Sequence, residues 1–248
     1  MRSNEEFEAV VDLCKSGLND CQVSRLTGVP RTTVRSMRTK GRKGWFRTGR
    51  TSADCPRCGS RPLDRQAYAY LLGLYLGDGC IATCPRGVYR LRIALDQKYL
   101  GIVGECIQAM EIVRGISVAN VGGVEGLGCV EGSSFWKHWP CLFPQHGPGP
   151  KWMRDIVLAE WQEEIVKEHP DKLLRGLIHS DGCRDLNWVK GKSYPRYQFK
   201  NNSFQIQEIF TWACERVGVH WCRTFWSTIS VARRPSVSIL DQIVGPKF

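Results

Sequence analysis

The chain has 248 residues and a formal net charge of +11, and 42% of its residues are hydrophobic, enough for one large folded domain and a smaller one. The N-terminal MRSNEEFEAV lacks the apolar stretch of a signal peptide, and no window approaches the roughly 20 apolar residues of a membrane span. We therefore expect no membrane association and a cytoplasmic protein, whose twelve cysteines, without a framework spacing, are reduced thiols.

Residues 5–39 have the pattern of a helix-turn-helix. Gly17 breaks a first amphipathic helix, Asp20 can cap the N-terminus of a second, and Gly28 ends it. Pro30 fits the first turn of a third helix, RTTVRSMRTK. The spacing is that of resolvase-like and sigma-like members of this motif class and predicts an all-α domain over residues 1–40.

In that motif the third helix enters the major groove with its N-terminal residues at the base edges. The candidate base contacts are Arg31, Thr32, Thr33, Arg35 and Ser36. Arg38, further along, suits a phosphate. The alternative is a small helical domain used for protein contacts.

Residues 41–65 are expected to be a basic linker. Residues 31–65 hold 11 Lys and Arg against two Asp and Glu, which indicates a phosphate-binding segment, since backbone charge dominates nucleic-acid affinity. The plainer interpretation is a solvated basic connection.

Within this segment Cys55 and Cys58 have the spacing of a zinc knuckle. A structural Zn²⁺ site needs four ligands, and the sequence has no second Cys-x-x-Cys. Cys80 and Cys84 are the nearest pair, but Cys80 is expected to point elsewhere. Both zinc binding and a simple pair of thiols in a turn stay open.

Two later stretches are nearly alike: residues 71–79 read LLGLYLGDG and residues 174–182 read LRGLIHSDG. Small residues stand four positions apart before each Asp-Gly: Gly73 and Gly77, then Gly176 and Ser180. Residues four apart share one helix face, where small side chains let two backbones approach closely. If the helices pack together, Asp78 and Asp181 meet at their C-terminal ends.

A carboxylate is unfavourable at the partly negative end of a helix, and two together are worse. A bound cation relieves this repulsion, and Mg²⁺ (or Mn²⁺) prefers such oxygen ligands together with a substrate phosphate. Metal ions held over a phosphodiester form a known hydrolytic arrangement. We expect Asp78 and Asp181 to be metal ligands, joined by the backbone carbonyls of Gly77 and Ser180.

The two stretches resemble the signature of the LAGLIDADG homing endonucleases in their single-chain, two-motif form, over roughly residues 66–248. Leu76 stands where the family has its first acid, and His179 and Ser180 depart from the usual residues of the second motif. The resemblance implies that Asp78 and Asp181 are metal-binding catalytic acids. It also implies a monomer with pseudo-twofold symmetry that binds double-stranded DNA.

The chain after residue 65 divides into two units of the same order, residues 66–170 and 171–248, which fits the family's fold. The expected class is α+β, with tandem αββαββα repeats and saddle-shaped antiparallel sheets behind the all-α front domain. Strands are expected near 80–84, 88–96, 116–121 and 128–136, then 183–189, 194–200, 220–226 and 229–232. Helices are expected at 98–110, 155–170, 203–217 and 236–243.

Alternation in YRLRIALD places Arg90 and Arg92 on one strand face and the apolar residues on the other. Lys200 stands on the polar face of RYQFKNN, and Arg184 opens the strand before it. An exposed basic sheet face suits contact with a DNA groove, so these four residues are candidate DNA contacts.

The family places a basic residue late in each unit, near each metal. Two loops end in Gly-Pro-Lys, which nominates Lys151 and Lys247 as this pair. The family also has a polar residue that orients solvent, which Gln198 matches, whereas the first unit is expected to have an apolar residue near the equivalent place. An ordinary surface lysine is the alternative for each of the two.

These features favour a sequence-specific DNA endonuclease that makes a metal-dependent double-strand cut by phosphodiester hydrolysis, in the nucleoid. The alternative is a non-cleaving DNA-binding transcriptional regulator on the same fold, which the fused helix-turn-helix favours. A degenerate copy would be expected to lose the acids, and both are present. An RNA maturase on the same scaffold is a third interpretation.

Overall fold

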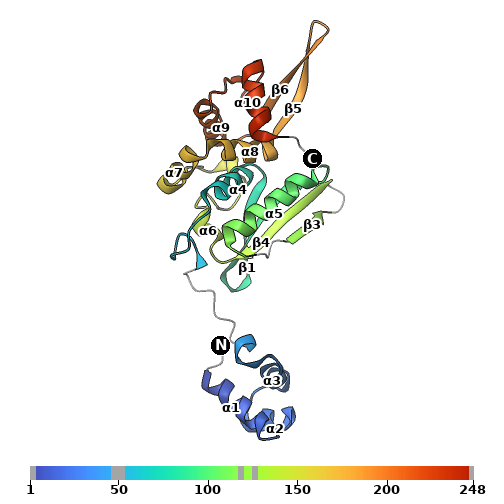
Figure 1. Ribbon diagram of the computed structural model, residues 1–248, viewed down its shortest axis with the longest axis vertical. Helices are drawn as coiled ribbons and strands as arrows, with labels where there is room; N and C mark the ends of the chain where they lie inside the picture. The colour runs from blue at the N-terminus through green and yellow to red at the C-terminus, as the bar shows by residue number, and fades with distance from the viewer. Residues whose placement is uncertain (1–3, 46–53, 117–119, 125–127, 246–248) are drawn as a thin grey trace. The chain divides into compact units, whose positions relative to one another are not determined.

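The computed structural model describes residues 4–45, 54–116, 120–124 and 128–245. They belong to two compact units, a front unit of residues 1–54 and a main unit of residues 55–248 (Figure 1). Within the described ranges, no helix combines the length and apolar character that crossing a membrane requires.

The described residues of the front unit form three helices, as expected. They are α1 (Asn4–Lys15), α2 (Asp20–Thr27) and α3 (Arg31–Trp45). A small apolar core joins them, formed by Phe7, Val10, Val23, Val29, Val34 and Met37. Gly28 ends α2 with φ of +67°, a conformation that glycine adopts without steric cost.

The N-terminal cap of α2 differs from the expectation. Asn19, not Asp20, accepts hydrogen bonds from the backbone N–H groups of Cys21 and Gln22, and the Gln22 side chain accepts from the Asn19 N–H. This reciprocal capping box satisfies more helix-end donors than Asp20 could one residue later. Asp20 instead forms an ion pair of 3.3 Å with Arg38.

The expected linker, residues 41–65, is wrong at both ends. Helix α3 continues to Trp45, and the segment from Cys55 belongs to the main unit. The Cys55 side chain is fully buried there, and the Arg61 guanidinium donates to the Val113 carbonyl. Its Gly, Ser and Arg content did not reveal these long-range contacts.

The main unit contains two four-stranded antiparallel sheets with the same strand order, β1-β2-β4-β3 and β5-β6-β8-β7. The first repeat comprises α4 (Arg65–Asp78), β1 (Gly79–Cys84), β2 (Val88–Asp96), α5 (Leu100–Arg114), β3 (Asn120–Val124), β4 (Cys129–Trp136), α6 (Trp139–Leu142) and α7 (Glu160–Glu168). The second comprises α8 (Pro170–Asp181), β5 (Gly182–Val189), β6 (Lys192–Lys200), α9 (Phe204–Arg216), β7 (Cys222–Phe225), β8 (Thr228–Val231) and α10 (Arg234–Val244). The duplicated α+β architecture is confirmed.

Two expected elements differ in extent. Strand β3 is described over Asn120–Val124, and residues 117–119 of the strand expected near 116–121 lie outside the described residues. The helix expected over 155–170 is confined to Glu160–Glu168, because Pro170 opens α8 instead of following a longer helix.

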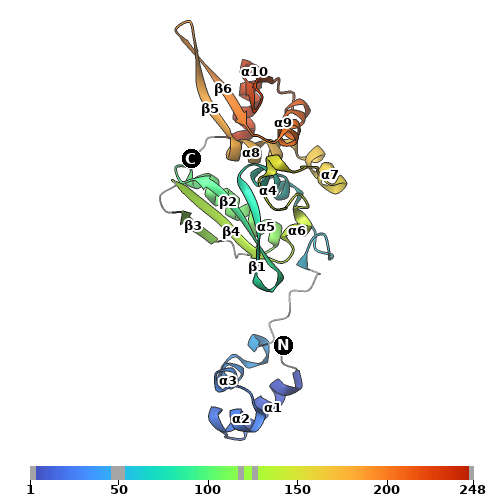
Figure 2. The same cartoon turned by 180° about the vertical axis from the view of Figure 1, so that it is seen from behind.

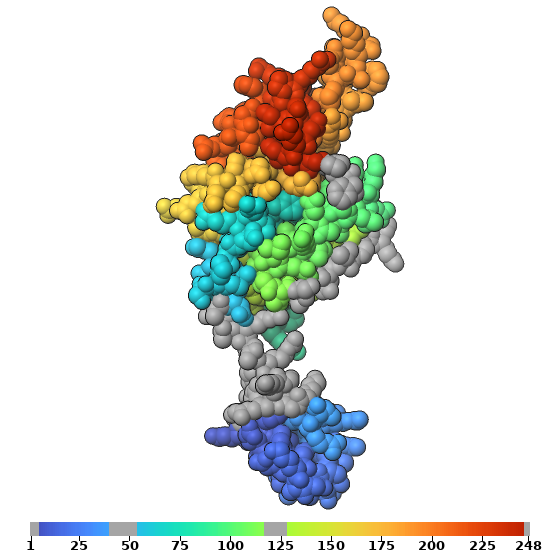
Figure 3. Space-filling view, in the orientation of Figure 1, coloured from blue at the N-terminus to red at the C-terminus, as the bar shows by residue number. Residues whose placement is uncertain are grey.

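Helices cover one face of each sheet, and α4 and α8 lie side by side between the two sheets (Figures 1 and 2). In β2 the side chains of Leu91, Ile93 and Leu95 are buried toward the helices, whereas Arg90 and Arg92 lie on the other face, as the alternation predicted. We call the side without helices the open face. The β5–β6 hairpin stands out from the body of the unit (Figure 3).

Candidate active site

Helices α4 and α8 pack so closely that glycine is required where they meet. A Cβ built on Gly73 would lie 2.5 Å from the Leu173 carbonyl oxygen, and one built on Gly176 would clash with the Tyr70 carbonyl oxygen. One turn later Gly77 faces Ser180 in the same way. The small residues four apart therefore do bring two helix backbones together.

Each helix passes directly into the first strand of its repeat through Asp-Gly. A Cβ on Gly79 would lie 2.5 Å from the Tyr75 Cα, and one on Gly182 would lie 2.7 Å from the Ile178 Cα. The chain turns back on its own last helical turn at these glycines, so the preceding aspartate ends the helix. Asp78 and Asp181 stand at the adjacent C-terminal ends of α4 and α8.

Asp181 lies in an unfavourable environment for a negative charge. Burial raises the pKa of its carboxyl to about 6, and the charge of Asp78 acts in the same direction. The Asn201 side-chain amide donates to Asp181 Oδ2 at 2.5 Å and, with Lys151, opposes the rise. A divalent cation would remove this penalty.

Lys151 reaches the same place as the first residue of the 3-10 turn Lys151–Met153. Its ammonium donates to the Gly77 carbonyl at 2.5 Å. Burial lowers its pKa to about 8, and attraction to Asp181 and Asp78 acts in the opposite direction. The Lys151 ammonium is thus attracted to both carboxylates.

Arg154 holds the loop that carries Lys151. Its guanidinium donates to the carbonyls of Gln145, Gly147, Pro148 and Gly149, the last at 2.5 Å. These bonds satisfy a run of backbone acceptors that has no strand or helix partner. Arg154 is therefore a positioning residue for Lys151, and sequence reasoning missed it.

The two half-sites differ in their polar residues. Gly79 pairs with Ile93 and Gly182 with Phe199, so the place equivalent to Gln198 is held by Arg92. The apolar residues expected near that place, Leu91 and Ile93, flank Arg92. Two residues after Phe199, the second repeat has Asn201, which donates a hydrogen bond to Asp181. Two residues after Ile93, the first repeat has a buried leucine, Leu95.

Asn201 is the clearest site residue that the sequence reading missed. Its side-chain oxygen accepts from the Ser203 N–H at 2.7 Å, which orients the amide nitrogen toward Asp181. The available signal was the run Asn201-Asn202-Ser203 directly after the expected strand 194–200. A pocket at this point is lined by Leu76, Gly77, Lys151, Trp152, Asp181, Lys200, Asn201 and Asn202.

His179 departs from the usual motif for a structural reason. Its Nε2 lies 3.3 Å from the Val244 carbonyl oxygen, and its Nδ1 lies 2.9 Å from the Tyr70 hydroxyl. The buried imidazole thus links α8 to α4 and to the end of α10.

The donors fit a hard divalent cation. The site combines two carboxylates with the Gly77 carbonyl, all oxygen atoms, and the raised pKa of Asp181 shows that its negative charge is disfavoured without a cation. Asp78, Asp181 and the carbonyls of Gly77 and Ser180 are the residues that would hold the ion.

The candidate DNA contacts fall into different places. Arg90 and Arg92 lie on the open face of the first sheet, where both form ion pairs with Glu131. Lys200 lies on the open face of the second sheet. Arg184 shares the opposite, helix-covered face with Tyr197 and forms a two-bond ion pair with Asp241, so it does not join the other three.

Three further nominations concern other parts of the chain. In the front unit, Arg31, Thr32 and Arg35 are exposed, and Thr33 and Ser36 are partly buried. Lys247 falls outside the described residues. Cys55 and Cys58 lie with His138 and Cys141 in a separate cluster.

No protein-family model matches the sequence, and no curated protein does. Among solved structures, the homing endonuclease I-WcaI bound to its DNA recognition sequence aligns with a TM-score of 0.50 and 12% identity, over 76% of this chain and 84% of that one. Mesophilic variants of the homing endonuclease I-DmoI give 0.48 and 16%, over 73% and 97%. The N-terminal LAGLIDADG domain of DUF199/WhiA gives 0.46 and 8%, over 74% and 83%.

At such identities the likeness concerns the fold. The paired glycine-rich helices, the repeated strand order and the I-WcaI alignment agree with one another. The main unit has the LAGLIDADG homing-endonuclease fold.

Proposed function

We propose that this protein is a sequence-specific DNA endonuclease that cuts both strands by divalent-metal-dependent phosphodiester hydrolysis. The observation that carries the proposal is the group formed by Asp78, Asp181 and Lys151. Two acids close adjacent helices, and one buried ammonium is attracted to both of them. A fold that served only to bind DNA would have no need of this electrostatically unfavourable group.

The metal, when bound, supplies Lewis-acid activation of the phosphate and of the attacking water. Asp78 and Asp181 would hold it. Asn201 keeps the Asp181 carboxylate oriented and favours its ionised form. Lys151 provides a fixed positive charge where negative charge develops on the phosphate, and Gln198, on the open face, is proposed to orient solvent.

The open sheet faces are the proposed DNA-binding surface. Arg90 and Arg92 are held by Glu131, and Arg90 also donates to the Ser133 hydroxyl at 3.2 Å, so their guanidinium groups are oriented before DNA arrives. Oriented arginines suit contacts with guanine edges or phosphates. Lys200 extends this surface to the pocket that contains Asp181.

The front unit is proposed to add affinity through α3. Arg31, Thr32 and Arg35 are exposed near its N-terminus, the end that reads base edges in helix-turn-helix proteins. Deleting residues 1–54 should leave a folded main unit that cuts with weaker or less selective binding, because each unit has its own apolar core. Thermal unfolding and cleavage of the truncated chain check this, and an insoluble product would contradict it.

The second candidate is a DNA-binding regulator that does not cut, which the front unit favours. The two functions are separated by selecting cleaved sites from a randomised duplex library with Mg²⁺, beside a binding selection with Ca²⁺. Recovery of one cleaved sequence family that matches the bound family is expected. A bound family without cleavage, in Mg²⁺ and Mn²⁺ alike, would establish the regulator instead.

A further inference from the structure

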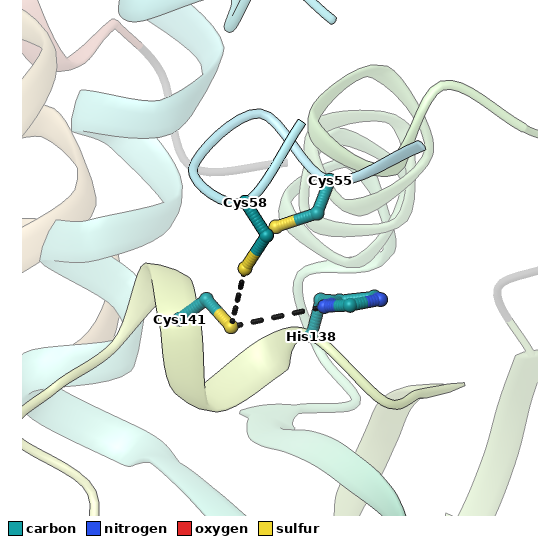
Figure 4. A group of neighbouring side chains, drawn as sticks. All are labelled: Cys55, Cys58, His138 and Cys141. Carbon is teal, nitrogen blue, oxygen red and sulfur yellow. Dashed lines mark hydrogen bonds between the residues drawn. The ribbon is translucent and has the colours of Figure 1, made fainter. Parts of the chain in front are cut away.

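Four side chains capable of binding a soft metal meet in the main unit, away from the aspartates. Cys55 and Cys58 come from the turn that begins the unit, and His138 and Cys141 from the start of α6 (Figure 4). Their ligand atoms all lie within 4.8 Å of one another. The two halves have spacings of Cys-x-x-Cys and His-x-x-Cys, 83 residues apart as measured between Cys58 and Cys141.

The distances suit one tetrahedral ion. Zinc–sulfur bonds of about 2.3 Å and zinc–nitrogen bonds of about 2.0–2.1 Å place neighbouring ligands roughly 3.5–3.8 Å apart. The Cys58 and Cys141 sulfurs are 3.3 Å apart, and the Cys141 sulfur is 3.8 Å from His138 Nδ1. Shifts of less than an ångström in these two distances would reach that geometry.

Backbone hydrogen bonds hold the turn that carries Cys55 and Cys58. The backbone N–H groups of Arg57 and Cys58 donate to the Cys55 sulfur. The Gly59 N–H donates to the Cys55 carbonyl at 2.8 Å and closes the turn. Outer hydrogen bonds of this kind orient metal ligands in proteins.

Aromatic side chains pack around the cluster. The Arg57 guanidinium lies 4.4 Å from the centre of the Trp161 ring, and Trp161 packs on Tyr68 of α4. The Trp136 ring meets the His138 ring edge-on at 5.3 Å. These contacts hold both halves of the cluster against the main core.

We propose that Cys55, Cys58, His138 and Cys141 bind one structural Zn²⁺ ion. Three soft thiolates and an imidazole form a closed set of four, the ligand number and type of structural zinc sites, with no position left for substrate. The ion fastens the first residues of the main unit to α6. It is distinct from the oxygen-ligated site of Asp78 and Asp181, which selects a hard cation.

The sequence reading found half of this site. It required a second Cys-x-x-Cys, whereas the structure supplies His138-Trp139-Pro140-Cys141. Cys80, the nearest alternative that we weighed, is absent from the cluster.

The test measures zinc in the full-length protein, purified with reduced thiols, by elemental mass spectrometry. One ion per chain is expected, falling to near zero in a Cys58→Ser/Cys141→Ser double variant. Cys222 is exposed and lies outside the cluster, so Cys222→Ser is the matched control, and this variant should still bind one zinc ion. Asp78→Asn and Asp181→Asn should keep it too, which separates this site from the proposed active site.

Replacement of zinc by Co²⁺ in the wild-type chain gives a second readout that does not depend on folding of a variant. Tetrahedral d–d bands with thiolate charge transfer are expected, and a strong chelator should lower the melting temperature by roughly 10 °C. Substoichiometric zinc in reduced, folded protein would overturn the proposal. So would a Cys58–Cys141 disulfide in the protein isolated from cells.

Discussion

The two half-sites of the main unit share a backbone but differ in their surroundings. In both, an aspartate ends a helix and a glycine begins a strand. Asp78 is exposed, whereas Asp181 is partly buried and accepts a hydrogen bond from Asn201. At the place equivalent to Asn201 the first repeat has Leu95, which contributes to the core.

This difference shows that the duplicated backbone fixes the positions of the two acids but not their electrostatic surroundings. Those surroundings depend on side chains such as Asn201 and Leu95, at equivalent positions of the two repeats. Burial makes ionisation costly at Asp181, and the Asn201 amide offsets part of that cost. Lys151 belongs to the first repeat, and its ammonium is attracted to both acids, which couples the two half-sites electrostatically. The next four experiments test whether the half-sites act as a unit or separately.

The largest expected effect is on cleavage by Asp78→Asn and Asp181→Asn. Each should lower the rate of double-strand cleavage by roughly a thousandfold or more, because metal-based stabilisation is worth several kcal/mol. Affinity for DNA in Ca²⁺ should stay within a few fold. Asp171→Asn, at the opposite end of α8, serves as control. Normal cleavage by either variant contradicts the active-site assignment.

Lys151→Ala should slow single-turnover cleavage on the order of 10²–10³-fold with little change in DNA affinity, since it removes a charge that acts on the transition state. Because both acids act on its ammonium, both strands should slow, which cleavage of duplexes labelled on each strand measures. Lys172→Ala, at the start of α8, is the control. Slowing confined to one strand would instead indicate a division of labour with Lys247.

Asn201→Leu makes the second half-site resemble the first. A hydrogen bond to a charged group is worth about 1.5–3 kcal/mol, so the acid limb of the pH–rate profile should move up by about one pH unit or more. The rate at neutral pH should fall up to about tenfold. Asn202 lines the same pocket, but the hydrogen bond to Asp181 comes from Asn201, so the control Asn202→Leu should leave the pH–rate profile unchanged. An unmoved profile in Asn201→Leu would show that this bond does not set the ionisation of Asp181.

The smallest effect concerns stability without metal. The folded-state pKa of Asp181, about 6, exceeds the ordinary 3.8, so the folded protein holds this proton more tightly than the unfolded chain. The stabilisation that protonated Asp181 gives to the folded state is fully present below pH 3.8 and is lost as the pH rises through 6. Asp181→Asn should therefore be about 1–3 kcal/mol more stable than wild type at pH 7 and equal to it at low pH.

Urea unfolding across this pH range measures the difference. Mg²⁺ should reduce it by stabilising the wild type alone, because the ion binds the ionised carboxylate. A difference that stays constant from pH 4 to 7 would point to packing instead of ionisation.

Local patterns in the sequence determined the elements and their repetition. Alternation predicted which residues of β2 face the core, and small residues four apart, followed by Asp-Gly, predicted the helix pair and its two terminal acids. The repeated Gly-Pro-Lys nominated Lys151. Each of these signals depends on neighbours within a few residues, where helix and strand periodicity operates.

The tertiary structure alone decided which distant residues meet. It placed Asn201 on Asp181, turned Arg184 toward Asp241, and joined Cys55 and Cys58 to a histidine and a cysteine far along the chain. It also ended the linker at Cys55, whose burial depends on the packed core. Such contacts are fixed by how helices and sheets dock over long sequence separations, and no local periodicity encodes that docking.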